Sequence, residues 1–439
     1  MRQLSGKRVV VVGMGLSGAA AVKLLLREGA QVRAVDEKHR GEMEGVKVEP
    51  QTEAAFDDAE LVVISPGVPA DLDLLTPVRA HGVPVIGELE LAAPYLKGPT
   101  IGITGTNGKT TTTALTGHIL RESGIACQVG GNIGTAPADM VATSRPDQWN
   151  VLELSSFQLE TAENFHATIA ACLNVTQNHL DRHHTFDNYA NAKARIFETQ
   201  SSDDLAVLNA DDPVTVSFAK RTKAKTVWFS GTHQVPGAWL DGDLIRLNGS
   251  ELLNVCDLRL RGRHNYENAM AAALMAHQAG APLEQIAGAA ATFAPVEHRL
   301  EFVREIAGVG YYNDSKATSV DATLKAISAF SGGLWIILGG KDKGSDYTVL
   351  REPLRAKARA ALLIGAAASK IERQLTGDTF PVVQCGTLAA AIDKASHSAV
   401  AGDTVLLAPA CSSFDQFESY EHRGRVFKSL VNALAKENR

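Results

Sequence analysis

The residues best suited to chemistry form a glycine-rich loop in the first third of the chain. The run GITGTNGKTT occupies residues 102–111, after a short apolar strand that begins at Thr100 and before a predicted helix. Backbone N–H groups of such a loop can surround a phosphate, while Lys109 offers a positive charge and the Thr110 hydroxyl can bind Mg²⁺. The loop departs from the usual G-x-x-x-x-G-K-[ST] pattern because Ile103 stands where the first glycine is expected. We predict that ATP binds here, through Gly105, Thr106, Asn107, Gly108, Lys109, Thr110 and Thr111.

A second glycine-rich turn lies near the N-terminus. Gly13, Gly15 and Gly18 follow a predicted strand and open a helix, and Asp36 ends the next strand. Glycines let the backbone approach a diphosphate at the helix N-terminus, and the acid can accept hydrogen bonds from ribose or base donors. Only about 90 residues precede the next domain, too few for both halves of a dinucleotide-binding fold, so a UDP-sugar fits this segment better than NAD. A turn that serves only helix packing is the alternative.

Three further side chains could lie beside the phosphate loop. Glu153 lies at the C-terminal end of a predicted strand, where its carboxylate could hold Mg²⁺ or have only a structural or solvated role. His179 follows another strand, and with His183 and His184 it could suggest zinc. The absence of an HExxH arrangement and of a cysteine partner favours an ordinary polar role instead. Lys193 lies in an alanine-rich helix, where spacing alone predicts a solvated lysine.

Two polar loops follow predicted strands in the last third of the chain. They are NDSKAT at residues 313–318 and GGKDKG at residues 339–344. Lysines and hydroxyls at strand ends suit the binding of a compact anionic group. Turn formation alone explains the same composition, so both interpretations stay open at this point.

Short β-branched runs alternate with longer periodic stretches, which is typical of α/β folds with parallel sheets. We predict strands over residues 9–12, 31–35, 61–64, 151–154, 170–175, 206–208, 309–313, 334–338, 361–364 and 404–408. We predict helices over residues 266–277 and 283–293, and short strands and turns over residues 222–262. The expected domains are residues 1–93, 94–295 and 296–439.

Length and composition agree with this organisation. At about 150 residues per domain, the 439 residues predict roughly three domains. The net charge of −6 lacks the basic excess that is typical of nucleic-acid binding. The five scattered cysteines form no CxxC pair, which favours a reducing compartment. No apolar stretch approaches the roughly 18 residues of a membrane helix, so we expect a cytoplasmic protein without membrane insertion.

Taken together, the motifs resemble those of the Mur ligase family along the whole chain. The matching segments, in the family's order, are GMGLSG, SPGV, GITGTNGKTT, GGNIG, ELSSFQLE, NVTQNHLDRH, NAKARIFE, HNYENA, EHRLE, NDSKATS, GGKDKG and APACSSFDQF. An ordered set of this length is far more specific than an ATP-binding loop alone. Within the family, SPGV, ELSSFQLE and ACSSFDQF most resemble ligases that add D-glutamate to UDP-N-acetylmuramoyl-L-alanine.

The resemblance implies three α/β domains: a Rossmann-like N-terminal UDP-binding domain, a central P-loop ATPase with a mostly parallel sheet, and a Rossmann-like C-terminal domain that closes on the amino acid. It implies amide formation through an acyl phosphate and a tetrahedral intermediate, with release of ADP and phosphate, in cytoplasmic peptidoglycan precursor synthesis. ATP and one or two Mg²⁺ ions are the implied cofactors. We expect a monomer without a nucleic-acid partner.

The family's functional positions carry over to matching residues of this sequence. The implied catalytic residues are Lys109, Lys193, His179 and Asp314. The implied ATP contacts outside the phosphate loop are Asn268, Arg299 and Asp314. The implied metal ligands are Thr110, Glu153, His179 and Lys193, the last as a carbamate. The implied UDP-substrate contacts are Leu16, Ser17, Asp36, Ser65, Pro66, Gly67, Asn132 and Ser155. The implied D-glutamate pocket comprises Thr318, Lys343, Ser413, Phe414 and Tyr420.

Two positions depart from the family's pattern. Asn178 replaces an acid that often precedes the histidine, which removes a charge beside the metal site, and Tyr420 stands where phenylalanine can occur. The alternatives are another Mur ligase or a folate polyglutamate synthase with a different acceptor, and a nucleotide-binding module without turnover. A dehydrogenase is a weaker alternative because it leaves the second glycine loop unexplained.

Overall fold

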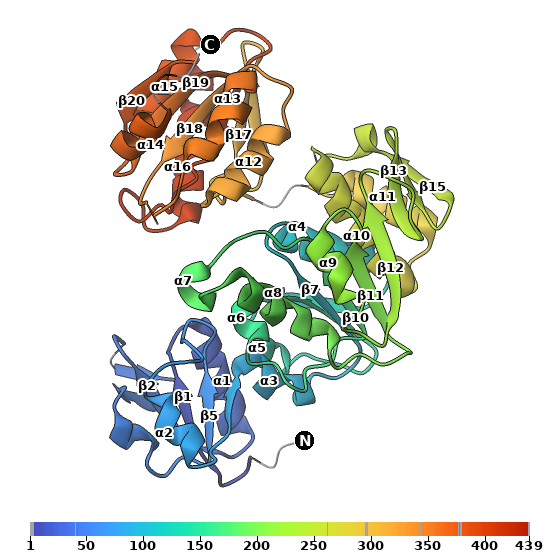
Figure 1. Ribbon diagram of the computed structural model, residues 1–439, viewed down its shortest axis with the longest axis vertical. Coiled ribbons are helices and arrows are strands. Elements are labelled where there is room, and N and C mark those ends of the chain that lie inside the picture. Colours follow the sequence, from blue (N-terminus) through green and yellow to red (C-terminus); the bar gives the residue numbers. More distant parts are fainter. Residues whose placement is uncertain are drawn as a thin grey trace. The chain divides into compact units, whose positions relative to one another are not determined.

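The computed structural model describes residues 4–39, 41–260, 262–294, 297–342, 344–375, 377 and 380–437. This part of the chain divides into two compact units, Met1–Leu258 with Tyr266–Phe293 and Arg259–Asn265 with Ala294–Arg439. The first unit contains an N-terminal and a central sheet, and the second contains a C-terminal sheet (Figure 1). The predicted three-domain α/β fold is confirmed, while the predicted boundaries near residues 93 and 295 stay a prediction.

The N-terminal sheet places both glycine-flanked strand ends at one edge. Its strand order is β3-β4-β2-β1-β5-β6, and β1 pairs in parallel with β2 and β5. The strands are β1 (Arg8–Val12), β2 (Gln31–Asp36), β3 (Gly41–Met43), β4 (Val46–Pro50), β5 (Leu61–Ile64) and β6 (Val85–Gly87). The helices are α1 (Leu16–Arg27), α2 (Leu75–Ala80) and α3 (Glu88–Ala92). Four consecutive buried valines make β1 a central parallel strand with both faces covered.

The central sheet carries the phosphate loop on an inner strand. Its strand order is β15-β14-β13-β12-β11-β10-β7-β9-β8, parallel from β8 to β13 and antiparallel at β14 and β15. The strands are β7 (Thr100–Thr104), β8 (Cys127–Gly131), β9 (Trp149–Glu153), β10 (Ile169–Cys172), β11 (Leu205–Asn209), β12 (Lys225–Ser230), β13 (Gly237–Asp241), β14 (Leu244–Leu247) and β15 (Ser250–Asn254). The segment predicted as short strands and turns therefore extends this sheet.

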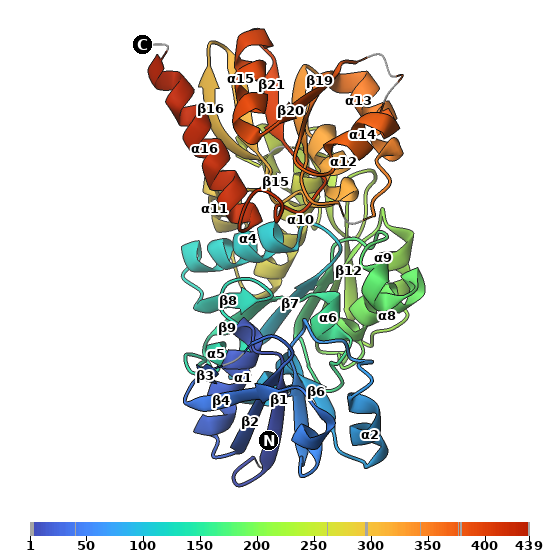
Figure 2. The same ribbon diagram turned by 90° about the vertical axis from the view of Figure 1, so that its left-hand side faces the viewer.

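The helices of the central domain surround that sheet. They are α4 (Lys109–Glu122), α5 (Pro137–Met140), α6 (Ser156–Leu159), α7 (Leu180–His183), α8 (Phe186–Ala194), α9 (Pro213–Phe218), α10 (Arg263–Gln278) and α11 (Leu283–Thr292). Helix α4 follows the phosphate loop and packs on β7, β8 and β9 (Figure 2). Because β7 lies between β9 and β10, the loop lies between the carboxyl ends of these two strands.

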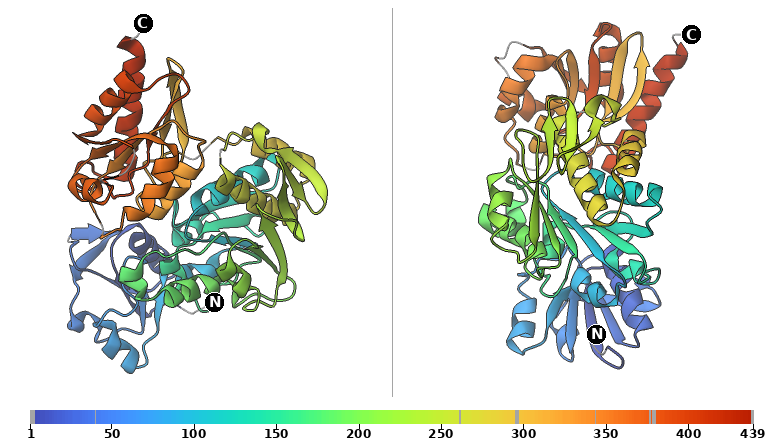
Figure 3. Two further views of the ribbon diagram at one scale, coloured as in Figure 1. Left: turned by 45° about the horizontal axis from the view of Figure 1, so that its top comes forward. Right: turned by 90° about the vertical axis from the view of Figure 1, so that its right-hand side faces the viewer.

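The C-terminal sheet has the order β16-β17-β21-β18-β19-β20, with an antiparallel edge strand β16. Its strands are β16 (Glu301–Ile306), β17 (Val309–Asn313), β18 (Leu334–Gly339), β19 (Ala358–Ile364), β20 (Val382–Gly386) and β21 (Thr404–Leu407). Its helices are α12 (Val320–Ser328), α13 (Arg351–Lys357), α14 (Ala368–Leu375), α15 (Leu388–Ser398) and α16 (Tyr420–Glu437). Residues of α12, α13 and α14 form the core on one face, and residues of α15 and α16 form the core on the other. Helix α16 is the red helix that ends near the C label in Figure 3.

Among the described residues, no helix is both long enough and apolar enough to cross a membrane. The predicted strand at residues 61–64 coincides with β5, and that at residues 309–313 coincides with β17. The strand predicted to reach Val175 ends at Cys172, and beyond it the Asn174 carbonyl accepts from the Thr106 N–H of the phosphate loop at 2.8 Å.

Candidate functional site

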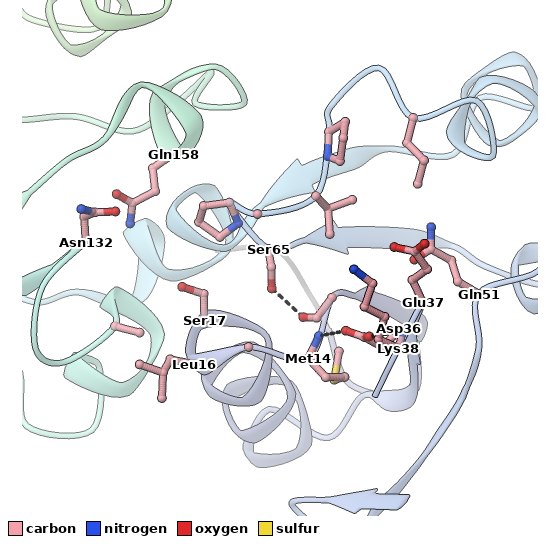
Figure 4. A pocket seen from close by; sticks show the side chains of 18 of the residues that line it. Met14, Leu16, Ser17, Asp36, Glu37, Lys38, Gln51, Ser65, Asn132 and Gln158 are labelled. Atoms are coloured by element: carbon pink, nitrogen blue, oxygen red, sulfur yellow. Dashed lines mark hydrogen bonds between the residues drawn. The ribbon is translucent and has the colours of Figure 1, made fainter. Parts of the chain in front are cut away.

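A cavity of about 530 Å³ opens at the carboxyl edge of the N-terminal sheet (Figure 4). One wall belongs to the N-terminal domain and the other to the central domain. The lining includes these predicted UDP-substrate contacts: Leu16, Ser17, Asp36, Ser65, Pro66, Gly67 and Asn132. It also includes polar residues that we did not predict, namely Glu37, Lys38, Gln51 and Gln158.

Glycines allow the N-terminal wall to close tightly. Gly13 has a φ of +87°, and a Cβ added to it would lie 2.6 Å from Val68 Cγ2. A Cβ on Gly18 would lie 1.9 Å from the Gly13 carbonyl oxygen. The Ser65 hydroxyl donates to that same carbonyl at 2.6 Å. Side chains at either glycine would therefore push the turn away from the loop that begins at Ser65.

Asp36 fixes the turn from the end of β2. Its carboxylate accepts hydrogen bonds from the backbone N–H groups of Met14 at 2.6 Å, His39 at 2.7 Å and Lys38 at 2.8 Å. Partial burial opposes ionisation, but these three bonds outweigh it and hold the pKa of Asp36 below its ordinary value. The cavity therefore presents an ionised carboxylate, which suits hydrogen-bond donors of a ribose or a base.

The central wall includes Asn132 and Gln158 of the short helix α6. Ser155 caps this helix: its hydroxyl accepts from the Gln158 N–H at 3.3 Å, and its own N–H donates to the Gln158 side chain at 3.0 Å. This capping box occupies Ser155, which does not line the cavity, and it orients Gln158 instead. The motif ELSSFQLE contains this capping signal.

The phosphate loop is held in shape by side chains from elsewhere in the central domain. The Asn107 N–H donates to the Asn174 side chain at 2.9 Å, and Asn174 donates back to the Asn107 carbonyl at 3.1 Å. Gly108 has a φ of +85°, and a Cβ there would lie 2.2 Å from the Asn268 side-chain oxygen. Asn268, a predicted ATP contact, therefore lies directly against the loop.

Two lysines converge on this loop. Lys109 Nζ and Lys193 Nζ each donate to the Gly105 carbonyl at 2.8 Å. Lys193 is only 1% exposed, so the solvated position expected from its spacing is wrong. Burial and then repulsion from Lys109 hold the pKa of Lys193 well below its ordinary value, against opposing effects of Cys172 and Glu153. The two lysine side chains thus place two amine nitrogens at the loop where a phosphate would bind.

Glu153 ends β9 beside the same loop and is 2% exposed. Its Oε1 accepts from the Asn132 side chain at 2.9 Å, and its Oε2 is buried without a hydrogen-bond partner among the described residues. Thr110, at the start of α4, is also buried. An unpartnered carboxylate oxygen and a hydroxyl suit a hard cation such as Mg²⁺, so the residues present fit this ion.

His179 stands at the exposed end of the site. It has a φ of +53° and precedes α7. Its ring centroid lies 4.9 Å from that of Phe157 and 6.3 Å from that of Tyr189. Lys193 Nζ lies 4.7 Å from the centroid of the Tyr189 ring. Tyr189 thus connects the surroundings of His179 with those of Lys193.

In the second unit, Asp314 follows β17 and is buried. Its Oδ1 accepts from the Leu300 N–H at 3.2 Å. Burial raises the pKa of Asp314 to about 6, against the opposing effects of Arg299, that hydrogen bond and Lys316. Arg299 Nε is buried and has no hydrogen-bond partner within the described ranges. The structure therefore brings the predicted ATP residues Arg299 and Asp314 together.

The loops predicted to bind D-glutamate follow β17, β18 and β21, which are neighbours in the sheet. The Ser315 hydroxyl donates to the Tyr420 carbonyl at 2.8 Å, and the Lys341 N–H donates to the Ser412 carbonyl at 2.9 Å. These contacts join the segments that carry the predicted residues Thr318, Ser413, Phe414 and Tyr420. Ser413 is buried and Phe414 is exposed. Lys343 lies outside the described residues.

Arg423 supports these loops, although the sequence analysis did not select it. This residue of α16 is fully buried. Its Nε donates to the Ser315 hydroxyl at 2.9 Å, and its Nη2 donates to the carbonyls of Ser315 at 2.9 Å and Cys411 at 3.2 Å. Charged residues are common in an amphipathic helix, so the sequence of α16 alone does not indicate a buried role for this arginine. Only the fold shows that it is buried against these loops.

Family profiles match three stretches of the chain. The matches are "Mur ligase MurD-like, N-terminal domain" at residues 7–87, "Mur ligase middle domain" at residues 103–276 and "Mur ligase, glutamate ligase domain" at residues 298–411. Two relatives are each named UDP-N-acetylmuramoylalanine--D-glutamate ligase. The protein of Solibacter usitatus is 60% identical over 98% of this chain and 99% of its own. The protein of Koribacter versatilis is 50% identical over 99% of both chains.

Solved structures share the fold at low identity. A pseudomurein peptide ligase type C from Methanothermus fervidus has a TM-score of 0.63 at 20% identity, covering 98% of this chain and 100% of its own. The UDP-N-acetylmuramate-alanine ligase MurC from Thermotoga maritima has a TM-score of 0.61 at 19% identity, covering 97% and 99%. These two structures therefore share with this chain the arrangement of helices and strands.

Proposed function

The chain belongs to the Mur ligase family, and we propose that it joins D-glutamate to UDP-N-acetylmuramoyl-L-alanine by an ATP-dependent amide ligation. The relatives at 60% and 50% identity carry the name of this ligase. The observation that carries the proposal is the position of Asn132. This residue lines the cavity at the carboxyl edge of the N-terminal sheet, here called the nucleotide cavity, and its amide donates to Glu153 beside the phosphate loop. A substrate bound in the cavity would thereby direct its free carboxylate toward the phosphates of ATP.

The reaction needs ATP because the oxygen of a carboxylate is a poor leaving group. The substrate carboxylate attacks the γ-phosphorus, the bond to the β-phosphate oxygen breaks, and ADP leaves. The amine of D-glutamate then attacks the carbon of the acyl phosphate. The tetrahedral intermediate collapses to the amide as phosphate leaves and the amine nitrogen loses its proton. The protein's contribution is positioning and charge stabilisation.

The phosphate loop supplies this stabilisation. Its backbone N–H groups surround the phosphates, and Lys109 offsets their negative charge. Its glycines permit the close approach, because Gly108 has a left-handed φ of +85°. We place Asn268, which lies against this loop, at the adenine, and Arg299 with Asp314 near the same nucleotide.

Thr110, Glu153 and His179 would hold Mg²⁺, together with a modified Lys193. When bound, the ion offsets charge on the phosphates and polarises the γ-phosphoryl group. The support is the buried Oε2 of Glu153, which has no hydrogen-bond partner among the residues that the structure describes. Asn132 orients the other oxygen of this carboxylate at 2.9 Å, as an outer partner of a metal ligand does.

Lys193 is proposed to react with carbon dioxide. The neutral amine attacks the carbon, one C–O π pair moves to oxygen, and the nitrogen releases a proton, which leaves a carbamate anion. The support is geometric: Lys193 is 1% exposed and shares the Gly105 carbonyl with Lys109, so two adjacent ammonium groups would repel each other. The carbamate replaces one of these charges with oxygen ligands suited to Mg²⁺.

The C-terminal domain is proposed to hold D-glutamate. Hydroxyl groups of Thr318, Ser413 and Tyr420 can donate to its carboxylates, and Lys343 would add a positive charge. We also infer a cytoplasmic monomer. ATP as a substrate and the free cysteines support the location.

The test is phosphate release from ATP in the presence of UDP-N-acetylmuramoyl-L-alanine and D-glutamate, with each component omitted in turn. The proposal predicts release only from the complete mixture. Release without D-glutamate, or at an equal rate with L-glutamate, would reject the assigned reaction. Nucleotide binding without turnover would instead indicate a nucleotide-binding module.

A further inference from the structure

A single arginine of the central domain reaches across to the N-terminal domain. Arg182, in α7, is largely buried, with a side chain 13% exposed. Its Nη2 donates to the carbonyl oxygen of Val68 at 2.7 Å. The same nitrogen forms an ion pair with Glu160, whose side chain is 15% exposed. The guanidinium carbon lies 5.0 Å from the centroid of the Phe157 ring. One planar group thus binds partners from both domains.

On the N-terminal side, Arg182 holds the loop that lines the nucleotide cavity. Ser65 and Val68 are both lining residues of this cavity. The N-terminal domain already fixes the conformation of this loop, because the Ser65 N–H donates to Val12 at 2.9 Å and the Ser65 hydroxyl donates to Gly13 at 2.6 Å. The bond from Arg182 is therefore not needed to set the conformation of the loop. It fixes the position of the loop relative to the central domain.

On the central side, Arg182 holds the segment that contains the other wall. Glu160 follows α6 directly, and α6 carries the lining residue Gln158. Phe157 of the same helix contacts both the Arg182 guanidinium and the ring of His179. The arginine is therefore attached to the helix that orients Gln158 toward the cavity.

A neighbouring contact provides a comparison. Asp71 and His184 also join the two domains, at 3.0 Å, but their side chains are 65% and 64% exposed. Exposed ion pairs contribute little because water screens them. The bond from Arg182 to Val68 is shielded, and hydrogen bonds of charged groups in such places are stronger than neutral ones. One nitrogen of Arg182, Nη2, reaches the carboxylate and the carbonyl together. The guanidinium also lies over the Phe157 ring, and the compact ammonium of lysine does not reproduce this planar contact.

We propose that Arg182 is a positioning residue that fixes the position of the N-terminal wall of the nucleotide cavity relative to the central wall. It thereby favours ligands that touch both walls over ligands that touch one. This inference rests on the proposed function, because it takes the ligand to be UDP-N-acetylmuramoyl-L-alanine with its UDP portion at the N-terminal wall. Arg182 itself needs no contact with the ligand.

The experiment measures Kd by isothermal titration calorimetry for UDP and for UDP-N-acetylmuramoyl-L-alanine, in the absence of ATP and of metal ions. In Arg182→Met we expect the Kd of the complete ligand to rise about tenfold, the effect of losing one charged hydrogen bond. The Kd of UDP should stay unchanged. Arg182→Lys keeps the positive charge on a shorter side chain without the planar contact with Phe157, and it should show the same selective loss at about threefold.

Two variants serve as matched controls. Arg195→Met removes an arginine that donates to the Ala162 carbonyl at 3.0 Å within the central domain. Asp71→Ala removes the exposed link to His184. Both controls should bind the two ligands as the wild type does.

The outcomes separate the inference from the proposed function. Wild-type protein that fails to bind UDP-N-acetylmuramoyl-L-alanine would contradict the proposed function. Wild-type binding together with unchanged binding by Arg182→Met would overturn the role of Arg182. Equal weakening of UDP and the complete ligand would also overturn it, because that result indicates a general loss of loop structure. If Arg182→Met does not fold, the selective loss in Arg182→Lys decides in the same way.

Discussion

Glu88 should make the stability of the first compact unit depend strongly on pH. This residue begins α3 and is 1% exposed. Its Oε1 accepts from the Ala138 N–H at 2.6 Å, and its Oε2 has no hydrogen-bond partner in the described part of the chain. Burial raises the pKa of Glu88 to about 8, opposed by the bond from Ala138 and assisted by the nearby Asp139. The folded protein therefore holds this carboxyl group in its protonated form at neutral pH.

The size of the effect follows from proton linkage. The ordinary pKa of the group is 4.5, so between pH 4.5 and pH 8 the folded state binds more protons at Glu88 than the unfolded state does. The free energy of unfolding consequently falls as the pH rises through this window. The fall is about 1.4 kcal/mol for each pH unit, or about 3 kcal/mol between pH 5 and pH 7.5.

Glu88→Gln should remove this dependence, because glutamine resembles the protonated acid in shape and does not ionise. For a domain of this size 1 kcal/mol corresponds to about 2 °C in Tm. When the pH rises from about 5 to about 7.5, the Tm of the variant should therefore rise relative to that of the wild type by about 6 °C. Thermal unfolding followed by circular dichroism at the two pH values measures this change.

The exposed Glu53 offers a matched control. Glu53→Gln should leave the difference in Tm between the two pH values as it is in the wild type. If the curves of Glu88→Gln and the wild type run parallel across this pH range, Glu88 is already ionised in the folded protein, and the reasoning from its burial is refuted.

Three further predictions concern the site. Lys193→Ala should lose most of the activity, and a small carboxylic acid should partly restore it; full activity in the variant would reject the carbamate. Gly18→Ala should raise the Kd of the UDP-substrate about tenfold or more, since the new Cβ would meet the Gly13 carbonyl at 1.9 Å, whereas Gly288→Ala, with no atom within 4 Å, should bind normally. Asn132→Ala should raise KM for both ATP and the UDP-substrate in steady-state assays; a change in only one would separate the two sites.

The two glycine-rich turns were predictable from sequence because their signals are local. The glycines of residues 13–18 and 102–111 act through backbone conformation and through the helix that follows each of them. Strands such as β5 were predictable for a similar reason, since a short β-branched run bounded by turn residues fits a buried parallel strand. The order of these and the other motifs along the chain then indicated the family.

Other features depend on contacts between distant segments and gave no local signal. The spacing around Lys193 predicted a solvated residue, but α8 turns this position toward Gly105, 88 residues earlier. Arg182 and Val68 meet across 114 residues. Gln158 is an exception, because the local capping box with Ser155, which the motif ELSSFQLE contains, orients it toward the cavity. The pairing of Arg182 with Val68 follows from the docking of two domains, and that of Lys193 with Gly105 follows from the fold of the central domain. Periodicity encodes neither of them.

The central claim is that the carboxylate of UDP-N-acetylmuramoyl-L-alanine is phosphorylated and then captured by D-glutamate. The most direct measurement uses this substrate with ¹⁸O in both carboxylate oxygens and follows the label by mass spectrometry. The account predicts that one labelled oxygen leaves in inorganic phosphate and the other stays in the new amide with D-glutamate. Amide product formed without label in the phosphate would contradict it.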